Sequence, residues 1–170
     1  MCDNLKRTKT NFIILAVIIL LVSADQIIKL IVEKLLKPIE EFTVIPDILR
    51  FRYLENDGAM MGFMDGKTGL MTVLSVICFG GLAVLIFSGK ISNKADLVNF
   101  VMICAGGLGN IIDRIFRGFV IDYIEVLFVD FYVFNFADCL ITVGAFLLFF
   151  NQLYQIYKEN KQKKAEVQNG

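Results

Sequence analysis

Long apolar runs, interrupted at a few charged positions, dominate this sequence and predict four membrane-spanning helices. A helix that crosses a bilayer needs about 20 predominantly apolar residues. Four segments are long enough and apolar enough: Phe12–Leu36, Gly69–Phe87, Leu97–Phe116 and Ala137–Tyr157. The second has no charged residue, and the fourth has only Asp138, near its start. The pattern therefore predicts an all-α membrane protein with four transmembrane helices.

The segments between these helices alternate β-branched or aromatic residues with polar ones, a pattern typical of short strands. Phe42–Ile45, Ile48–Leu54 and Val126–Val133 are the three candidate strands. We expect them to form a small extracytoplasmic β-sheet with a loop region. Residues 1–157 should then form a single polytopic membrane domain, and the polar segment 158–170 should be a disordered cytoplasmic tail.

Basic residues gather in three places that four spans would bring to one side of the membrane. They precede the first span, lie between the second and third, and follow the fourth: Lys6, Arg7, Lys9, Lys90, Lys94, Lys158, Lys161, Lys163 and Lys164. By the positive-inside rule this side, with both termini, should be cytoplasmic. Val22-Ser23-Ala24 also resembles the end of a cleavable signal peptide, but the helical pattern continues past Ala24.

Composition supports the membrane assignment and narrows the chemistry. The 170 residues are 56% hydrophobic with a mean hydropathy of +0.66, and 17 basic residues balance 17 acidic ones. A zero net charge gives no reason to expect a nucleic-acid partner. The chain has no histidine and its four cysteines form no cluster, so we expect no metal and no cofactor. The cysteines in apolar stretches should be small buried hydrophobic residues.

Polar residues of different helices converge at one depth. At about 1.5 Å rise per residue, Asp25 and Asn110 each lie roughly 20 Å from the cytoplasmic edge of their spans. Arg114 is one turn further out, and Asp138 begins the span that returns from outside. All four therefore belong to the outer third of the bilayer, with Asp122 in the connection just beyond. Ionisable residues at such depth indicate a functional site.

Each of these residues also has a structural explanation. Asp25 and Lys29 are spaced as an i,i+4 ion pair, which we favour over a catalytic role. Arg114 could end its helix or snorkel to the surface, and it could equally hold a carboxylate or a substrate carbonyl. Asp138 could be stabilised by the helix dipole alone. That last explanation does not account for Asp122.

Two neighbouring carboxylates can hydrolyse a peptide bond without a covalent intermediate. Their repulsion raises one pKa, so that one group is protonated while the other accepts a proton from water. Asp122 and Asp138 are the candidate pair. Asp113 should lie outside this pair, where it could contact a basic neighbour, so Asp113→Asn would be the internal control variant. The nearest rival chemistry, a serine–lysine peptidase, is disfavoured because Ser23 and Lys29 lie on different helix faces. A small ion-coupled transporter or channel is the alternative of another class.

Five motifs, in this order, resemble those of bacterial lipoprotein signal peptidase (signal peptidase II). The similarity covers about Thr10 to Tyr157. The motifs are Asp25-Gln-Ile-Ile-Lys29, Asn56-Asp-Gly58-Ala59, Gly109-Asn110-Ile-Ile-Asp113-Arg114, Gly118-Phe-Val-Ile-Asp122 and Phe134-Asn135-Phe-Ala137-Asp138. The resemblance implies an aspartic endopeptidase of the bacterial inner membrane, with its active site toward the outer face. Such enzymes cut prolipoproteins just before a cysteine that carries diacylglycerol.

The resemblance also implies roles for individual residues. Asp122 and Asp138 match the catalytic pair. Residues that match substrate-lining or supporting positions are Asn56, Gly58, Asn110, Arg114, Asn135, Asp25 and Lys29. The implied partners are diacylglyceryl-modified prolipoproteins, membrane lipids and globomycin-type inhibitors. The chain departs from the family pattern in one place: it has methionine at positions 60 and 61, Met60 and Met61, where family members often have an aromatic residue at one of the two. This difference affects the packing of the loop and not the chemistry.

Overall fold

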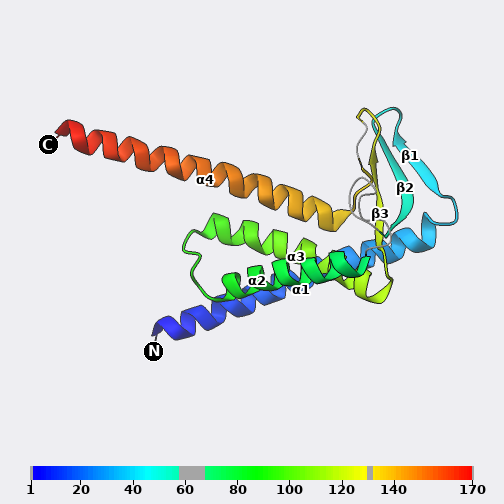
Figure 1. Cartoon of the computed structure of the whole chain (residues 1–170), viewed down its shortest axis with the longest axis horizontal. Helices are drawn as coiled ribbons and strands as arrows, with labels where there is room; N and C mark the ends of the chain where they lie inside the picture. Colours follow the sequence, from blue (N-terminus) through cyan, green and yellow to red (C-terminus); the bar gives the residue numbers. More distant parts are fainter. Residues whose placement is uncertain (1, 58–67, 130–131, 170) are drawn as a thin grey trace.

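In the part of the chain that the structure describes, four long helices and a small sheet at one end of them make up the fold (Figure 1). The computed structural model describes residues 2–57, 68–129 and 132–169. The helices are α1 (Cys2–Leu35), α2 (Thr68–Phe87), α3 (Lys94–Phe116) and α4 (Phe136–Asn169). The strands are β1 (Glu41–Ile45), β2 (Leu49–Asn56) and β3 (Val120–Val126).

All four helices are long and apolar enough to cross a membrane, which confirms the four predicted spans. Many large apolar side chains of these helices are exposed on the outside of the bundle, among them Phe12, Leu20, Val84 and Phe146. A soluble protein rarely exposes so much apolar surface, so these side chains face lipid. The protein is a multi-pass membrane protein.

Helix α3 is the centre of the bundle and packs against α1, α2 and α4. Glycines allow this close approach: a Cβ at Gly106 would meet the backbone oxygen of Ala137 on α4, and one at Gly107 would meet the Phe79 ring of α2. Cys104 is fully buried in this core, as predicted, whereas Cys78 is exposed on α2. The prediction of buried cysteines was therefore wrong for Cys78, because α2 is the least buried of the four spans, and Cys139 on α4 is only partly buried.

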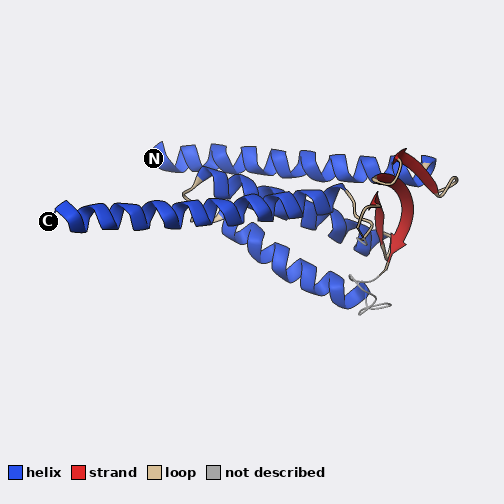
Figure 2. Ribbon diagram, turned by 90° about the horizontal axis from the view of Figure 1, so that it is seen from above, coloured by secondary structure: helices blue, strands red, loops and turns tan. Residues whose placement is uncertain are grey.

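The sheet is antiparallel with strand order β1-β2-β3, and it lies at the opposite end of the bundle from both chain termini (Figures 1 and 2). The first two predicted strands are confirmed within two residues. The third prediction, Val126–Val133, was wrong because the strand is Val120–Val126. Gly118 explains the earlier start, since its positive φ of 83° lets the chain reverse directly after α3.

The polar tail was predicted to be disordered, but α4 continues unbroken through it to Asn169. Lysine, glutamine and glutamate are good helix formers. Glu159 also precedes Lys163 by four residues, the favourable order for an i,i+4 pair. At about 1.5 Å per residue, α4 is roughly 50 Å long, and it extends past the other helices at the end away from the sheet (Figure 1).

Candidate active site

Asp122 lies on β3, where the sheet meets the helices, opposite Leu54 of β2. Its side chain is 2% exposed and accepts two amide hydrogen bonds. Asn56, the last residue of β2, donates from Nδ2 to Oδ2 at 2.8 Å, and Asn135 donates from Nδ2 to Oδ1 at 2.6 Å. Burial raises the pKa of Asp122 to about 7, an effect that the bonds from Asn56 and Asn135 partly offset and the nearby charge of Asp138 reinforces.

Asp138 lies in the first turn of α4 and is half-buried. It forms a reciprocal capping pair with Asn135: the Asp138 N–H donates to Asn135 Oδ1 at 3.0 Å, and the Asn135 N–H donates to Asp138 Oδ2 at 3.1 Å. Its other oxygen, Oδ1, accepts from Asn110 Nδ2 at 2.8 Å. Asp138 therefore does stabilise the N-terminus of α4, as one explanation from the sequence proposed. Its other oxygen contacts Asn110 and belongs to the site.

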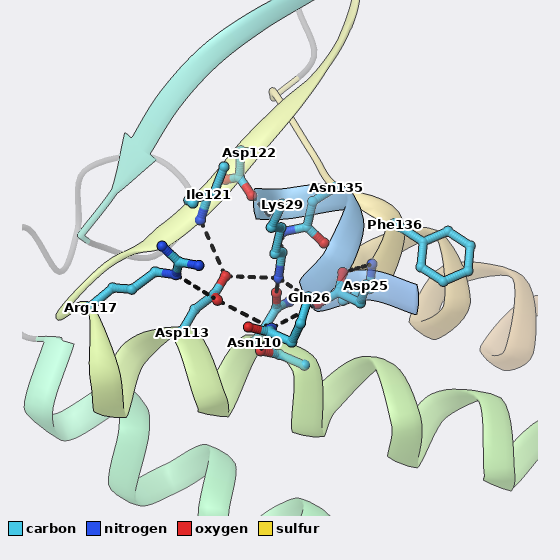
Figure 3. Close-up of polar contacts among 12 residues, drawn as sticks. Asp25, Gln26, Lys29, Asn110, Asp113, Arg117, Ile121, Asp122, Asn135 and Phe136 are labelled. Atoms are coloured by element: carbon cyan, nitrogen blue, oxygen red, sulfur yellow. Dashed lines mark hydrogen bonds and ion pairs between the residues drawn. The ribbon is translucent and has the colours of Figure 1, made fainter. Parts of the chain in front are cut away.

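Asn135 is the residue that joins the two aspartates. It is fully buried, its side-chain amide contacts Asp122, and its backbone N–H contacts Asp138. Its Nδ2 also lies 3.2 Å from Asn110 Oδ1. A carboxylate from a strand and another from a helix thus share one hydrogen-bond network of asparagines. Figure 3 labels Asp122, Asn135 and Asn110 of this network.

A second charged group, formed by Asp25, Lys29 and Asp113, lies beneath this network and is almost completely buried. The Lys29 ammonium contacts Asp25 Oδ2 at 2.9 Å, Asp113 Oδ2 at 2.8 Å and Asn110 Oδ1 at 3.0 Å. Its three protons are thus matched by three acceptors. The predicted Asp25–Lys29 ion pair is confirmed, with Asp113 as an additional partner.

Sequence reasoning placed Asp113 beside a basic neighbour, which the ion pairs with Lys29 and Arg117 confirm. Exchange of Asp113 is nevertheless unsuitable as a control, because it should itself disturb the protein. Asp113 is fully buried, and removal of one partner from a buried ion pair typically costs about 3–5 kcal/mol. Asp113 also accepts the backbone N–H of Ile121, the neighbour of Asp122, at 3.4 Å.

Two further residues of this group were missed. Gln26 Nε2 lies 3.2 Å from Asp25 Oδ2, Asp113 Oδ1 and the Gly109 carbonyl oxygen. Arg117 bridges Asp113 and Glu33. The only available signal was the spacing of Arg117, four residues after Asp113, which places both on one helix face.

Arg114 is partly buried on α3, and the charges of Asp138, Asp122 and Asp113 act on its guanidinium. Within the described ranges it forms no ion pair with them, and Arg117, not Arg114, is the C-cap of α3. The guanidinium is therefore within electrostatic range of the carboxylate pair without an ion pair to either member in the described ranges. Gly58, also predicted at the site, lies outside the described residues.

The site offers acid–base chemistry from carboxylates. Asp122, with a pKa of about 7, is partly protonated at neutral pH, whereas the capped Asp138 accepts hydrogen bonds at both oxygens. One proton shared by such a pair supplies an acid and a base together. In the described part of the chain, no three acidic or cysteine side chains are grouped so that they could hold a metal ion.

The family model and the related sequences that match this chain all point to the same family. The family model described as Signal peptidase (SPase) II matches residues 17–154. Lipoprotein signal peptidases of Lactobacillus gasseri and Halothermothrix orenii are 36% and 35% identical over 92% and 81% of this chain, and over 99% and 90% of their own lengths. A bacterial membrane enzyme solved by the in meso method at 2.3 Å resolution is 31% identical, with a TM-score of 0.75 over 84% of this chain and 88% of its own.

Proposed function

The chain belongs to the signal peptidase II family, and we propose that Asp122 and Asp138 are the catalytic pair of this enzyme. Membership makes the protein a protease that removes signal peptides from prolipoproteins. The transporter considered from the sequence has no support among these relatives. The observation that carries the residue assignment is the Asn135 link, which holds the two carboxylates in one network.

In the mechanism that we propose, a water molecule lies between the two carboxyl groups and the scissile carbonyl. The ionised carboxylate takes one proton from water as the water oxygen attacks the carbonyl carbon. The protonated carboxyl polarises the carbonyl oxygen and gives it its proton. The C–N bond then breaks as the proton taken from water passes to the departing nitrogen. One hydroxyl group of the intermediate returns its proton to the other carboxylate as the new carboxyl group forms, so that the pair again holds one shared proton.

The substrate side of the site is proposed from the family resemblance together with the placement of individual groups. The substrate is a prolipoprotein whose cysteine carries diacylglycerol, cut just before that cysteine, and globomycin-type peptides compete for the same place. Arg114 contacts the substrate, because the charges of both carboxylates act on its guanidinium. Asn110 and Asn56 hold the carboxylates, and Gly58, two residues after Asn56 in the sequence, supports the substrate according to the resemblance.

We also propose the orientation in the membrane. The protein lies in the bacterial inner membrane, surrounded by its lipids, with both termini in the cytoplasm and the sheet and active site toward the outer face. The supporting observation is that both termini lie at one end of the bundle (Figure 2), the end to which nine of the 17 basic residues belong. Residues 1–157 are the peptidase domain, and the helical segment 158–169 is its cytoplasmic extension.

Exchange of each aspartate for asparagine tests the proposed pair. Asp122→Asn and Asp138→Asn should each abolish cleavage of a diacylated prolipoprotein peptide, measured by mass spectrometry in detergent, because an amide cannot accept the proton of water. The double variant should be no worse than either single variant, since the two groups act as one unit.

Asp47→Asn is the matched control for this experiment. Asp47 is exposed in the turn between β1 and β2 and has a φ of 61°, which asparagine also tolerates. This variant should cleave at the wild-type rate. Substantial cleavage by a folded variant of Asp122 or Asp138 would disprove the assignment.

A further inference from the structure

Each proposed catalytic aspartate is preceded by a residue whose backbone N–H is held by another buried carboxylate. The N–H of Ala137, immediately before Asp138, donates to Asp25 Oδ1 at 3.1 Å. The N–H of Ile121, immediately before Asp122, donates to Asp113 Oδ2 at 3.4 Å. Two carboxylates outside the catalytic pair therefore contact the main chain one residue away from each member of the pair (Figure 3).

Lys29 connects these two carboxylates through a single ammonium group. Its Nζ lies 2.9 Å from Asp25 and 2.8 Å from Asp113, and all three side chains are at most 1% exposed. Its third contact, Asn110 Oδ1, orients the Asn110 amide so that Nδ2 points to Asp138. Because the three side chains are buried and paired with one another, this group has little freedom to change its dimensions.

The space around Asp25 confirms that its position is closely constrained. A Cβ built on Gly109 would lie 2.5 Å from Asp25 Oδ2 and 3.1 Å from its carboxyl carbon. A side chain at this position would therefore push Asp25 away from α3 and disturb its bond to Ala137. Gly80, on the lipid-facing part of α2, has no atom within 4 Å of an added Cβ.

We infer that Asp25, Lys29 and Asp113 form a buried clasp that fixes the distance between the two catalytic aspartates by holding the backbone N–H groups of Ala137 and Ile121. The three are positioning residues, since they act on the aspartates through the main chain and do not touch the reacting atoms. This inference rests on the proposed catalytic roles of Asp122 and Asp138.

The pH dependence of kcat/KM distinguishes a positioning role from a merely structural one. The active pair carries one proton, so activity is bounded by two apparent pKa values whose separation reflects the coupling between the carboxyl groups. Asp25→Asn and Asp113→Asn should loosen the clasp. Their kcat should fall by roughly 100-fold, the loss typical of misplaced reacting groups. The two apparent pKa values should also lie closer together, because the coupling between the carboxyl groups weakens, so the pH range of activity should become narrower.

Asp96→Asn is the control for the loss of a buried carboxylate. Asp96 is 7% exposed at the other end of α3 and accepts amide hydrogen bonds from Asn151 and Gln152. Its exchange should lower the unfolding temperature while kcat and the width of the profile stay unchanged. Clasp variants that unfold at lower temperature but keep the wild-type kcat and profile would overturn the inference.

Gly109→Ala tests the geometry without any change of charge, which matters because the Lys29 charge also acts on Asp122. We expect a folded protein whose kcat falls at least about tenfold with little change in KM, because Asp25 is displaced. Gly80→Ala is its matched control and should behave as wild type. Equal kcat in the two alanine variants would overturn the inference, and should the Asp113 variant not fold, this pair of variants decides the question alone.

Different experimental results would contradict the clasp and the catalytic assignment. Activity that persists in Asp122→Asn or Asp138→Asn contradicts the catalytic assignment and the inference with it. Activity that is lost in both of these variants but unchanged in Gly109→Ala contradicts the clasp alone.

Discussion

The hydrogen bond from Asn56 to Asp122 should set the alkaline limit of activity. Asn56 Nδ2 donates to Asp122 Oδ2 at 2.8 Å. The donated bond stabilises the ionised carboxylate, and it offsets part of the increase in the Asp122 pKa that burial causes. Asn56→Ala removes this donor, so the pKa of Asp122 should increase and the pair should keep its shared proton to higher pH.

The size of the effect follows from the energy of the bond. A hydrogen bond to a charged group is worth about 1.5–3 kcal/mol, and one pH unit corresponds to about 1.4 kcal/mol. Asp122 is 2% exposed, so solvent screening takes little away. The alkaline limb of kcat/KM, expected near pH 7 in the wild type because the pKa of Asp122 is about 7, should move up by about one to two pH units.

The assay is a series of kcat/KM measurements on a diacylated prolipoprotein peptide at closely spaced pH values. The position of the limb is the readout, because a change in substrate contact alters the height of the curve but not the ionisation of the free enzyme. Asn151→Ala removes an equivalent amide donor from Asp96, a bond of 2.6 Å far from the pair, and should leave the limb in place. An unmoved limb in folded Asn56→Ala would refute this reasoning.

Three further predictions concern the substrate, the mechanism and the topology. Arg114→Lys keeps the charge but loses the planar guanidinium, so KM for the lipidated peptide should increase severalfold; unchanged kinetics would reduce Arg114 to a helix-end charge. Turnover should be insensitive to EDTA, because the two carboxylates supply both acid and base, and a loss that zinc restores would contradict the mechanism. A cysteine introduced at Lys163 should react with a membrane-impermeant maleimide only after the cells are opened, and one introduced at Asp47 should react in intact spheroplasts; the reverse result would overturn the orientation.

The sequence alone was sufficient for the elements that depend on local composition. Runs of about 20 apolar residues can satisfy their backbone in lipid only as helices, so the four spans followed from hydropathy. Carboxylates next to lipid are energetically costly and are kept there mainly for function. This drew attention to Asp122 and Asp138 before any contact was known. The family motifs reinforced the same two residues.

The tertiary structure decided which partners each charge has, since hydropathy carries no information about neighbours that are distant in the chain. Asp113 illustrates this: its Lys29 partner is on another helix, and its contact with Ile121 depends on where β3 begins. That start was misplaced because Val126–Val133 is as rich in β-branched and aromatic residues as Val120–Val126, and only pairing with β2 distinguishes them. Which carboxylates hold the main chain, and which are free to react, is determined by packing between helices and sheet.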